Sequence, residues 1–425
     1  MKTLEFNRIQ EKIFIHEHSS GLKVFVIPKK GYNKIYSAFA TYYGSINNTF
    51  IAPDEEEETR VPDGIAHFLE HKLFEQKDGS VMDKFSRLGA DSNAYTSFTQ
   101  TVYLFSCTDQ FNENFRLLID FVQSPYLTDE NVEKEKGIIS QEIKMYNDNA
   151  NWRVFFNLLN AIYVNHPVSI DIAGTVESIS KITKETLYKC YNTFYHPSNM
   201  IIVTVGDIEP GSVFNMVEQG IKAKENPGSI RKTFPEEPPH HNKKYIEKTL
   251  AVAMPQFNMG IKDNSYVSGY ELLKRKVALE IVLSMLMGRS SVLYNQLYNE
   301  GLINQSFGME ASLEESFGYT VWGGQSKDPE RVSERIIAAI SKAQKDGLDK
   351  KSFDRIKKAH EGRFIGSLNS PENISHEFIP LYFKGAYFFE LTKVYEELTI
   401  DDAEEIFRDH FSIEPALSII WPMKT

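Results

Sequence analysis

Two apolar runs near the start of the chain predict β-strands. They read KVFVIPKK at residues 23–30 and KIYSAFATYYG at residues 34–44, and both are rich in β-branched and aromatic residues. A helix-compatible segment follows near residue 70, and a further strand begins at Asp91. Several helical segments come next, and the strand NMIIVTVGD, at residues 199–207, closes this part of the chain.

The second part of the chain repeats this order of elements. A strand at AVAMPQFNMGIKD leads to helices at ELLKRKVALEIVLSMLMG and SSVLYNQLYNEG, and a pair of strands lies within NQSFGMEASLEESFGYTVWGG. Helices then run from Asp328 to about Phe411, and ALSIIWPM supplies a closing strand. Strands grouped with helices in this way indicate an α+β fold. We therefore expect two homologous α/β-sandwich domains, each with helices packed on one face of an antiparallel-rich sheet.

A change in composition marks the expected boundary between the two domains. The chain has 425 residues, which is too long for one ordinary hydrophobic core. The segment KAKENPGSIRKTFPEEPPHHNKK is rich in proline and charge and lacks apolar periodicity, which is typical of an exposed linker. We predict an N-terminal domain at 1–222, a linker at 223–244 and a C-terminal domain at 245–425.

Charge and cysteine content exclude several classes of protein. Lys plus Arg number 47 against 58 Asp plus Glu, so the net charge is −11, which argues against a general nucleic-acid binder. Two cysteines, Cys107 and Cys190, cannot form a disulfide framework. The first 20 residues carry charges throughout, and no segment approaches 18 uninterrupted apolar residues, so we expect neither a signal peptide nor a membrane span. A cytoplasmic location is the default expectation.

The segment GIAHFLEHKLFE carries the clearest chemistry in the sequence. It places His67, Glu70 and His71 at positions one, four and five of a helix-compatible run. Positions i and i+4 share a helix face, so both imidazoles can reach one metal ion, and Glu70 lies close enough to take a proton from water there. The order is that of the inverted H-x-x-E-H zinc peptidases. Because a catalytic zinc site uses three protein ligands, another acidic, His or Cys ligand must come from elsewhere.

The segment EKEKGIISQEIKMYNDN offers candidates for the third ligand. Glu135 and Glu142 are seven residues apart, so a helix here would show both carboxylates on one face. Taken alone, the charge run around Glu135 is more typical of a solvated helix face.

These residues resemble the pitrilysin, insulysin and mitochondrial processing peptidase family. The resemblance rests on HFLEH followed 71 residues later by Glu142, with Glu135 one heptad earlier, and it extends to residues 89–105, 166–179 and 194–207. It implies that zinc is the cofactor, that Glu142 is the third zinc ligand, and that Glu135 supports the site by holding a ligand histidine in its tautomer. A second domain that has lost the metal site also matches the family's architecture.

The resemblance further implies a way to bind peptides. The segment GADSNAYTSFTQTVYLF resembles the strand that follows the family's active-site helix. Around Asn93, Ala94 and Tyr95 its alternating pattern suits a sheet edge whose free backbone groups could pair with an extended peptide. By resemblance, Asn93 binds the substrate backbone and Tyr95 contributes to a neighbouring side-chain pocket.

One departure from the family pattern predicts a partner. Active members carry an Arg and a Tyr in the second domain that reach the substrate carbonyl at the zinc. In the corresponding segment, SSVLYNQLYNEGLIN, Tyr298 stands where the Arg is expected and Asn304 where the Tyr is expected. Neither side chain can replace the one it stands for. The chain therefore resembles the zinc-bearing subunit of a heterodimer whose homologous partner supplies the Arg and the Tyr.

Two functions from different classes remain as hypotheses. The first is a zinc endopeptidase that cleaves short or unfolded peptides, held as an added strand in a two-domain chamber. The second is a non-catalytic peptide-binding or structural subunit of a peptidase-like complex. The intact H-x-x-E-H favours the first, because a subunit that only binds would not need Glu70. The acidic run DEEEETR, at residues 54–60, fits either a solvated loop or a surface that attracts basic peptides.

Overall fold

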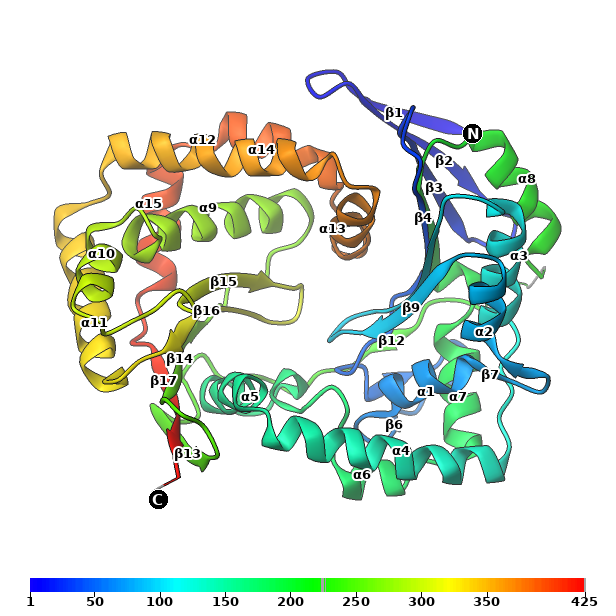
Figure 1. The fold of residues 1–425 in the computed structure, drawn as a ribbon, viewed down its shortest axis with the longest axis horizontal. Helices are drawn as coiled ribbons and strands as arrows, with labels where there is room; N and C mark the ends of the chain where they lie inside the picture. Colours follow the sequence, from blue (N-terminus) through cyan, green and yellow to red (C-terminus); the bar gives the residue numbers. More distant parts are fainter. Residues whose placement is uncertain (223–224, 226, 424–425) are drawn as a thin grey trace. The chain divides into compact units, whose positions relative to one another are not determined.

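The computed structural model describes residues 1–222, 225 and 227–423, and it divides into two compact units (Figure 1). Unit 1 consists of Met1–Ile143, Ile170–Thr233 and Ser367–Phe383. Unit 2 consists of Lys144–Ser169, Phe234–Gly366 and Lys384–Thr425. Each unit is built around one β-sheet with helices packed against it, so the α+β fold class expected from the sequence is confirmed.

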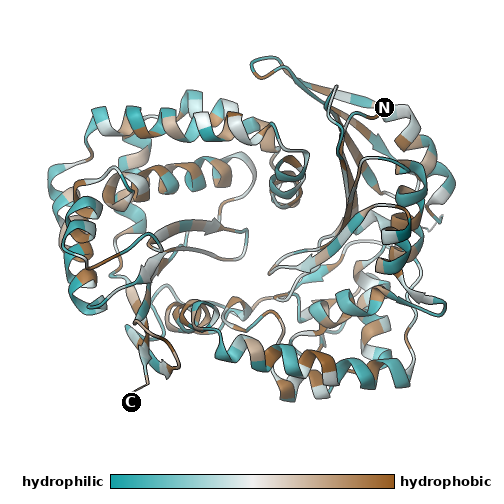
Figure 2. Cartoon of the chain, viewed as in Figure 1, coloured by the Kyte–Doolittle hydropathy of each residue, from teal (hydrophilic) through white to brown (hydrophobic). Residues whose placement is uncertain are grey.

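Unit 1 contains a seven-stranded sheet. In spatial order its strands are β1 (Lys2–Phe6), β2 (Glu11–Glu17), β3 (Lys23–Pro28), β11 (Met200–Gly206), β4 (Ile35–Thr41), β10 (Thr101–Cys107) and β9 (Asp91–Thr96). β3 and β11 are parallel, and the other neighbouring pairs are antiparallel. All residues of β11 are buried, as expected for a central strand, and Figure 2 shows the middle of this sheet largely in the hydrophobic colour.

Most helices of unit 1 lie in the first half of the sequence. They are α1 (Ile65–Leu73), α2 (Val81–Arg87), α3 (Phe111–Val122), α4 (Asp129–Asp148, whose last turn belongs to unit 2), α6 (Val176–Ser180), α7 (Lys184–Phe194) and α8 (Pro210–Gly220). α3 packs on β4 and β10 through Phe111, Phe115, Leu118 and Val122, which are buried at helical spacing. Short strands complete the unit: β5 (Thr49–Ile51), β6 (Thr59–Arg60), β7 (Glu75–Gln76), β8 (Gly79–Ser80) and β12 (Arg231–Lys232).

Unit 2 contains a five-stranded sheet that repeats part of the unit 1 sheet. Its spatial order is β13 (Tyr245–Leu250), β17 (Ala416–Pro422), β14 (Gln256–Lys262), β16 (Gly318–Gln325) and β15 (Gly308–Leu313). These strands correspond in order to β3, β11, β4, β10 and β9 of unit 1, and the parallel pair occupies the same place in both sheets. The strand topology therefore agrees with the internal duplication inferred from the sequence.

Seven α-helices of the described residues pack in unit 2, α5 from the first half of the chain and the others from the second. They are α5 (Ala150–Ile162), α9 (Gly269–Met287), α10 (Val292–Asn299), α11 (Pro329–Asp346), α12 (Lys350–Ser367), α14 (Leu391–Glu397) and α15 (Ile400–His410). α9 packs on β15, α10 and α15, whereas α5 packs on β14 and β17. Gly260 permits the close approach of α5, because a Cβ there would lie 2.8 Å from Leu158 Cδ2. Within the described residues, no single helix is long and apolar enough to cross a membrane, and only the bent pair of α9 and α10 meets that test when taken together.

Two helices depart from the domain boundaries expected from the sequence. α5 comes from the first half of the chain but belongs to unit 2, where it contacts β14 and β17. α13 (Pro371–Phe383) comes from the second half but belongs to unit 1, where it contacts the equivalent strands, β4 and β11. A single division at residues 223–244 does not describe this reciprocal exchange. Apolar periodicity shows that a helix has a face to bury, but it does not show which sheet the helix will cover.

The proline-rich residues 234–244, before β13, are held against unit 2 more firmly than their linker-like composition suggests. The Glu237 side chain is 4% exposed and forms an ion pair of 2.6 Å with Lys262. Glu237 also accepts hydrogen bonds from the backbone N–H groups of Val164, Asn165 and His166. Most of residues 234–244 are exposed, as expected, but this glutamate fixes that part of the segment to unit 2.

Candidate metal centre

Helix α1 places the H-x-x-E-H residues against the sheet of unit 1. Its apolar positions, including Phe68, Leu69 and Leu73, are fully buried, and the helix contacts β9 and β10. Gly64 begins the helix with φ of +90°, and a Cβ there would lie 2.4 Å from the carbonyl oxygen of Ala173. Glycine is therefore required at this close approach.

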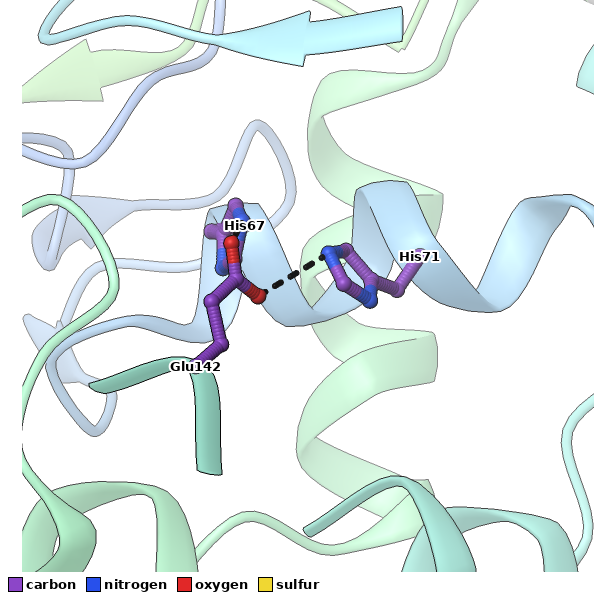
Figure 3. Close-up of side chains that lie close together, drawn as sticks. All are labelled: His67, His71 and Glu142. Atoms are coloured by element: carbon purple, nitrogen blue, oxygen red, sulfur yellow. Dashed lines mark ion pairs between the residues drawn. The ribbon is translucent and has the colours of Figure 1, made fainter. Parts of the chain in front are cut away.

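His67, His71 and Glu142 form a cluster that could hold a metal ion. One ligand atom from each residue lies within 4.8 Å of the other two. Glu142 Oε1 is 3.8 Å from His67 Nε2, and Glu142 Oε2 is 3.6 Å from His71 Nε2. Figure 3 shows the carboxylate of Glu142, on α4, pointing towards the two imidazole rings on α1.

The donor set fits zinc. Two imidazole nitrogens and one carboxylate oxygen are a common ligand set of catalytic zinc sites, in which a fourth position stays open. Zn–N and Zn–O bonds of about 2.1 Å in tetrahedral geometry separate neighbouring ligand atoms by roughly 3.4 Å. The observed separations of 3.6 and 3.8 Å are close to that value and are too long for hydrogen bonds of ideal geometry.

Glu135 lies directly against the second histidine. Its Oε1 is 3.1 Å from His71 Nδ1, and the residue is 7% exposed. A carboxylate accepts the Nδ1 proton, so the Nε2 lone pair of His71 is left facing Glu142. His67 has no equivalent support, because its buried Nδ1 lacks a hydrogen-bond partner within the described part of the chain.

The electrostatics differ between the two histidines. Burial, assisted by the neighbouring His71 and opposed by the nearby carboxylates, lowers the pKa of His67 to about 4, so His67 is neutral at pH 7 and able to bind a metal. Burial also lowers the pKa of His71, but the hydrogen bond with Glu135 and the nearby carboxylates outweigh it and raise the pKa overall. For Glu135, burial raises the pKa, and the contacts with His71 and Lys72 outweigh it and lower the pKa.

Glu70 lies on the same helix, between the two histidines in sequence, and is 8% exposed. It accepts a hydrogen bond of 2.6 Å from the hydroxyl of Thr96 on β9. Burial raises the pKa of Glu70 above that of an ordinary glutamate, and the Thr96 hydrogen bond opposes this. A carboxylate with a raised pKa is better suited to accept and return a proton near neutral pH.

The residues expected to bind substrate lie on β9, the terminal strand of the seven-stranded sheet. Asn93 is exposed, and its side-chain oxygen accepts a hydrogen bond from the N–H of Ala94. Tyr95 is partly buried and stacks on the ring of His376 from α13, with ring centroids 5.4 Å apart. The edge position expected from the alternating pattern is therefore present, whereas peptide binding there stays a prediction.

The two residues that depart from the family pattern belong to unit 2. Tyr298, at the end of α10, is 42% exposed and stacks on Tyr294. Asn304 donates a hydrogen bond to Gln325 Oε1 and accepts one from the N–H of Ser306. The Asn304 side chain is thus engaged in contacts within its own unit.

Two residues that contact the site were not identified from the sequence. Thr96 binds Glu70, and Lys72 lies 3.6 Å from Glu135. No local motif marks Thr96, because its contact with α1 arises only when β9 packs beneath that helix. Lys72 could have been noticed, because it follows His71 directly in a helix whose other faces are largely apolar.

Comparisons with known proteins identify two matching family models and several similar proteins. The model of the insulinase family, peptidase family M16, matches residues 55–176, and that of the peptidase M16 inactive domain matches residues 181–359. An uncharacterized zinc protease of Bacillus subtilis, YmfH, is 42% identical over 97% of both chains. The zinc protease PqqE of Helicobacter pylori is 25% identical over 84% of this chain and 80% of its own.

Solved structures show the same fold. An M16-like peptidase from Alicyclobacillus acidocaldarius matches with a TM-score of 0.95 and 37% identity, over 99% of this chain and 100% of that one. Pitrilysin matches 99% of this chain with 46% of its own, at a TM-score of 0.76 and 16% identity, which shows the fold alone. On the strength of the family models and of the 42% identity along nearly the whole chain, this protein belongs to the M16, or insulinase, family of peptidases.

Proposed function

We propose that the chain is a zinc-dependent endopeptidase that acts as the zinc-bearing subunit of a heterodimer. The observation that carries this proposal is the cluster of His67, His71 and Glu142, with the carboxylate of Glu70 on the same helix as both histidines. The relatives described as zinc proteases support the same class of reaction.

The side chains of the site divide the work among them. His67, His71 and Glu142 would hold zinc, and zinc, when bound, lowers the pKa of water and polarises a peptide carbonyl. Glu70 takes the proton from the attacking water and returns it to the leaving amine. Thr96 holds one oxygen of the Glu70 carboxylate by its 2.6 Å hydrogen bond, which fixes the direction from which the other oxygen can act.

The substrate is a short or unfolded peptide bound as an added strand. β9 is the terminal strand of its sheet, and its residue Thr96 contacts Glu70 directly. An extended peptide paired with this edge through Asn93, Ala94 and Tyr95 would run close to the metal ligands. Backbone pairing recognises the extended conformation rather than a sequence, so a folded protein would be a poor substrate.

A homologous partner chain completes the site in this proposal. Tyr298 and Asn304 stand where an Arg and a Tyr are expected, and neither can donate to a developing oxyanion as that pair would. The partner would carry the Arg and Tyr but lack an intact H-x-x-E-H. Loss of oxyanion donors typically costs about 10²- to 10³-fold in rate, so the isolated chain should be a weak peptidase.

The test is to measure zinc content and peptide cleavage together. The purified chain should bind about one zinc per molecule and cleave an unfolded peptide slowly, and a zinc chelator should abolish cleavage. Adding the homologous chain should raise the rate by roughly 10²-fold or more, and changing the partner's Arg should remove the gain.

Two results would contradict the proposal. Full activity from this chain alone, in a sample shown by mass spectrometry to contain no second subunit, would exclude the partner. Absence of zinc and of cleavage in every preparation would favour the second candidate, a non-catalytic subunit. The observation that supports this second candidate is that Tyr298 and Asn304 stand where the Arg and the Tyr are expected.

A further inference from the structure

Lys72 is a buried cation beside the candidate metal centre. It follows His71 on α1, and its side chain is 0% exposed. Lysine is almost never fully buried unless it is paired, because the ammonium group loses its hydration. The position therefore needs a specific set of acceptors.

Three acceptors surround the ammonium group. Lys72 forms an ion pair with Glu75 on β7 and donates a hydrogen bond of 3.2 Å to the main-chain oxygen of Asn131 on α4. Its third neighbour is Oε2 of Glu135, at 3.6 Å. That last distance is an ion-pair contact rather than a hydrogen bond of good geometry.

Glu135 is held from both sides as a result. One oxygen contacts His71 Nδ1 at 3.1 Å, and the other faces Lys72 Nζ at 3.6 Å. The carboxylate thus bridges a metal-facing histidine and a fully buried lysine. A side chain with two fixed contacts has fewer rotamers available than one that contacts the histidine alone.

We propose that Lys72 is a positioning residue for the metal centre, which holds the Glu135 carboxylate against His71 so that His71 Nε2 faces the metal. This inference rests on the proposed function. It assigns a role to a residue outside the H-x-x-E-H motif that touches neither metal nor substrate.

Two other effects of Lys72 compete with this role. Through the main-chain oxygen of Asn131, Lys72 also braces α1 to the start of α4, which would matter for stability but not specifically for the metal. A cation near a metal site also repels the metal. Glu75 neutralises most of that repulsion, because its carboxylate pairs directly with Lys72. Positioning should therefore dominate the effect of Lys72 on metal affinity.

A double-mutant cycle separates positioning from bracing. Zinc dissociation constants are measured by competition with a chromophoric chelator for the wild-type chain, Lys72→Met, Glu135→Gln and the double variant. Lys72→Met should weaken zinc binding by about 10-fold, and Glu135→Gln by about 10- to 100-fold, as is typical of outer-shell residues. The double variant should bind zinc within about 2-fold of Glu135→Gln alone, because Lys72 acts through Glu135.

Matched variants control for general damage. Lys84→Met removes a partly exposed lysine that pairs with Asp78 on the same unit, and should change zinc affinity less than about 2-fold. If Lys72→Met does not fold, Lys72→Gln keeps a donor for Asn131 while removing the charge, and the same loss of affinity is expected.

The outcomes distinguish this inference from the proposed function. Additive losses in the double variant, or tighter zinc binding by Lys72→Met, would overturn the positioning role while leaving the zinc site intact. A wild-type chain that binds no zinc would instead overturn the proposed function.

Discussion

In unit 2 the buried charged side chains form hydrogen bonds with one another. In unit 1, by contrast, metal-binding atoms of His67, His71 and Glu142 face one another. Asp263, which is 3% exposed, accepts hydrogen bonds from Arg275 at 2.8 and 3.0 Å and from His410 Nδ1 at 2.9 Å. His410 Nε2 in turn lies 2.7 Å from the Thr320 hydroxyl. His71 in unit 1 also has one nitrogen on a carboxylate, but its other nitrogen lies 3.6 Å from Glu142.

The difference shows what a duplicated sheet can do with buried polar residues. Both nitrogens of His410 are engaged, so that histidine has no lone pair left for a metal, and its network can only stabilise the unit. The Nε2 atoms of His67 and His71 instead face Glu142 at 3.8 and 3.6 Å, beyond the distance of a good hydrogen bond. The metal-facing side chains of unit 1 are therefore less stabilised by hydrogen bonds than the network of unit 2, and a bound metal ion would supply the missing stabilisation.

The largest effect is expected from breaking the closed network of unit 2. Asp263→Ala leaves the buried His410 without a carboxylate and Arg275 with only the exposed Asp409, which should cost about 3–5 kcal/mol of unfolding free energy. Urea denaturation of the zinc-free protein measures this change. Asp78→Ala, at an exposed ion pair with Lys84, is the control and should change stability by less than about 1 kcal/mol. A loss at Asp263 no larger than at Asp78 would contradict the comparison.

Removing the Glu142 carboxylate from the cluster of His67, His71 and Glu142 in unit 1 should instead weaken metal binding. Glu142→Gln replaces a charged ligand by a neutral amide, so zinc affinity should fall by more than the roughly 10- to 100-fold typical of outer-shell changes. Competition with a chelator measures the affinity. Glu133→Gln, at an exposed position of the same helix, should bind zinc normally. Unchanged affinity in Glu142→Gln would mean that the third ligand is another residue.

The smallest effect concerns the pH dependence of stability in unit 2. Burial lowers the pKa of His166 to about 4, with Glu237 opposing and Lys262 assisting. The unfolded chain, with a His pKa near 6.5, binds more protons between these values. Stability should therefore fall as the pH drops from about 6.5 towards 4, by at most about 1.4 kcal/mol per pH unit from this group.

His166→Gln isolates that contribution. Glutamine can keep an acceptor for the N–H of Val168, which His166 Nδ1 accepts at 3.1 Å, but it cannot be protonated in this range. The slope of unfolding free energy against pH should be shallower in the variant, because other histidines such as His360 titrate equally in both proteins. Equal slopes would show that His166 is not held neutral by burial.

Local pattern accounted for most of the fold. The strands β3, β4, β11 and β17 and the helices α1 and α9 lie where apolar spacing predicted them. The strands β1 and β2 are not among the predicted elements, although apolar residues lie next to charged ones in both, a pattern typical of half-buried strands. The hairpin of β9 and β10 was expected as one strand. The exchange of α5 and α13 between units depends on tertiary packing and leaves no local signal.

The candidate site was predictable to the extent that its residues lie on one helix. His67, Glu70 and His71 follow from helical geometry, because the helix alone fixes their common face. Glu135 and Glu142 are far away in sequence: their helical spacing made them candidates, and the family resemblance assigned the ligand role to Glu142 and the supporting role to Glu135. Thr96 and Lys72 are defined by contacts between elements, and spacing along the chain does not encode such contacts.

The central claim is that unit 1 holds zinc for catalysis and that Glu70 is the base. Glu70→Gln tests it most directly, because the change removes the proton acceptor and leaves His67, His71 and Glu142 in place. Zinc content and peptide cleavage are measured on the same sample, alone and with the homologous chain. The account predicts about one zinc per molecule and a loss of roughly 10²- to 10⁴-fold in cleavage rate. A Glu70→Gln protein that keeps its zinc and cleaves peptides at the wild-type rate would contradict it.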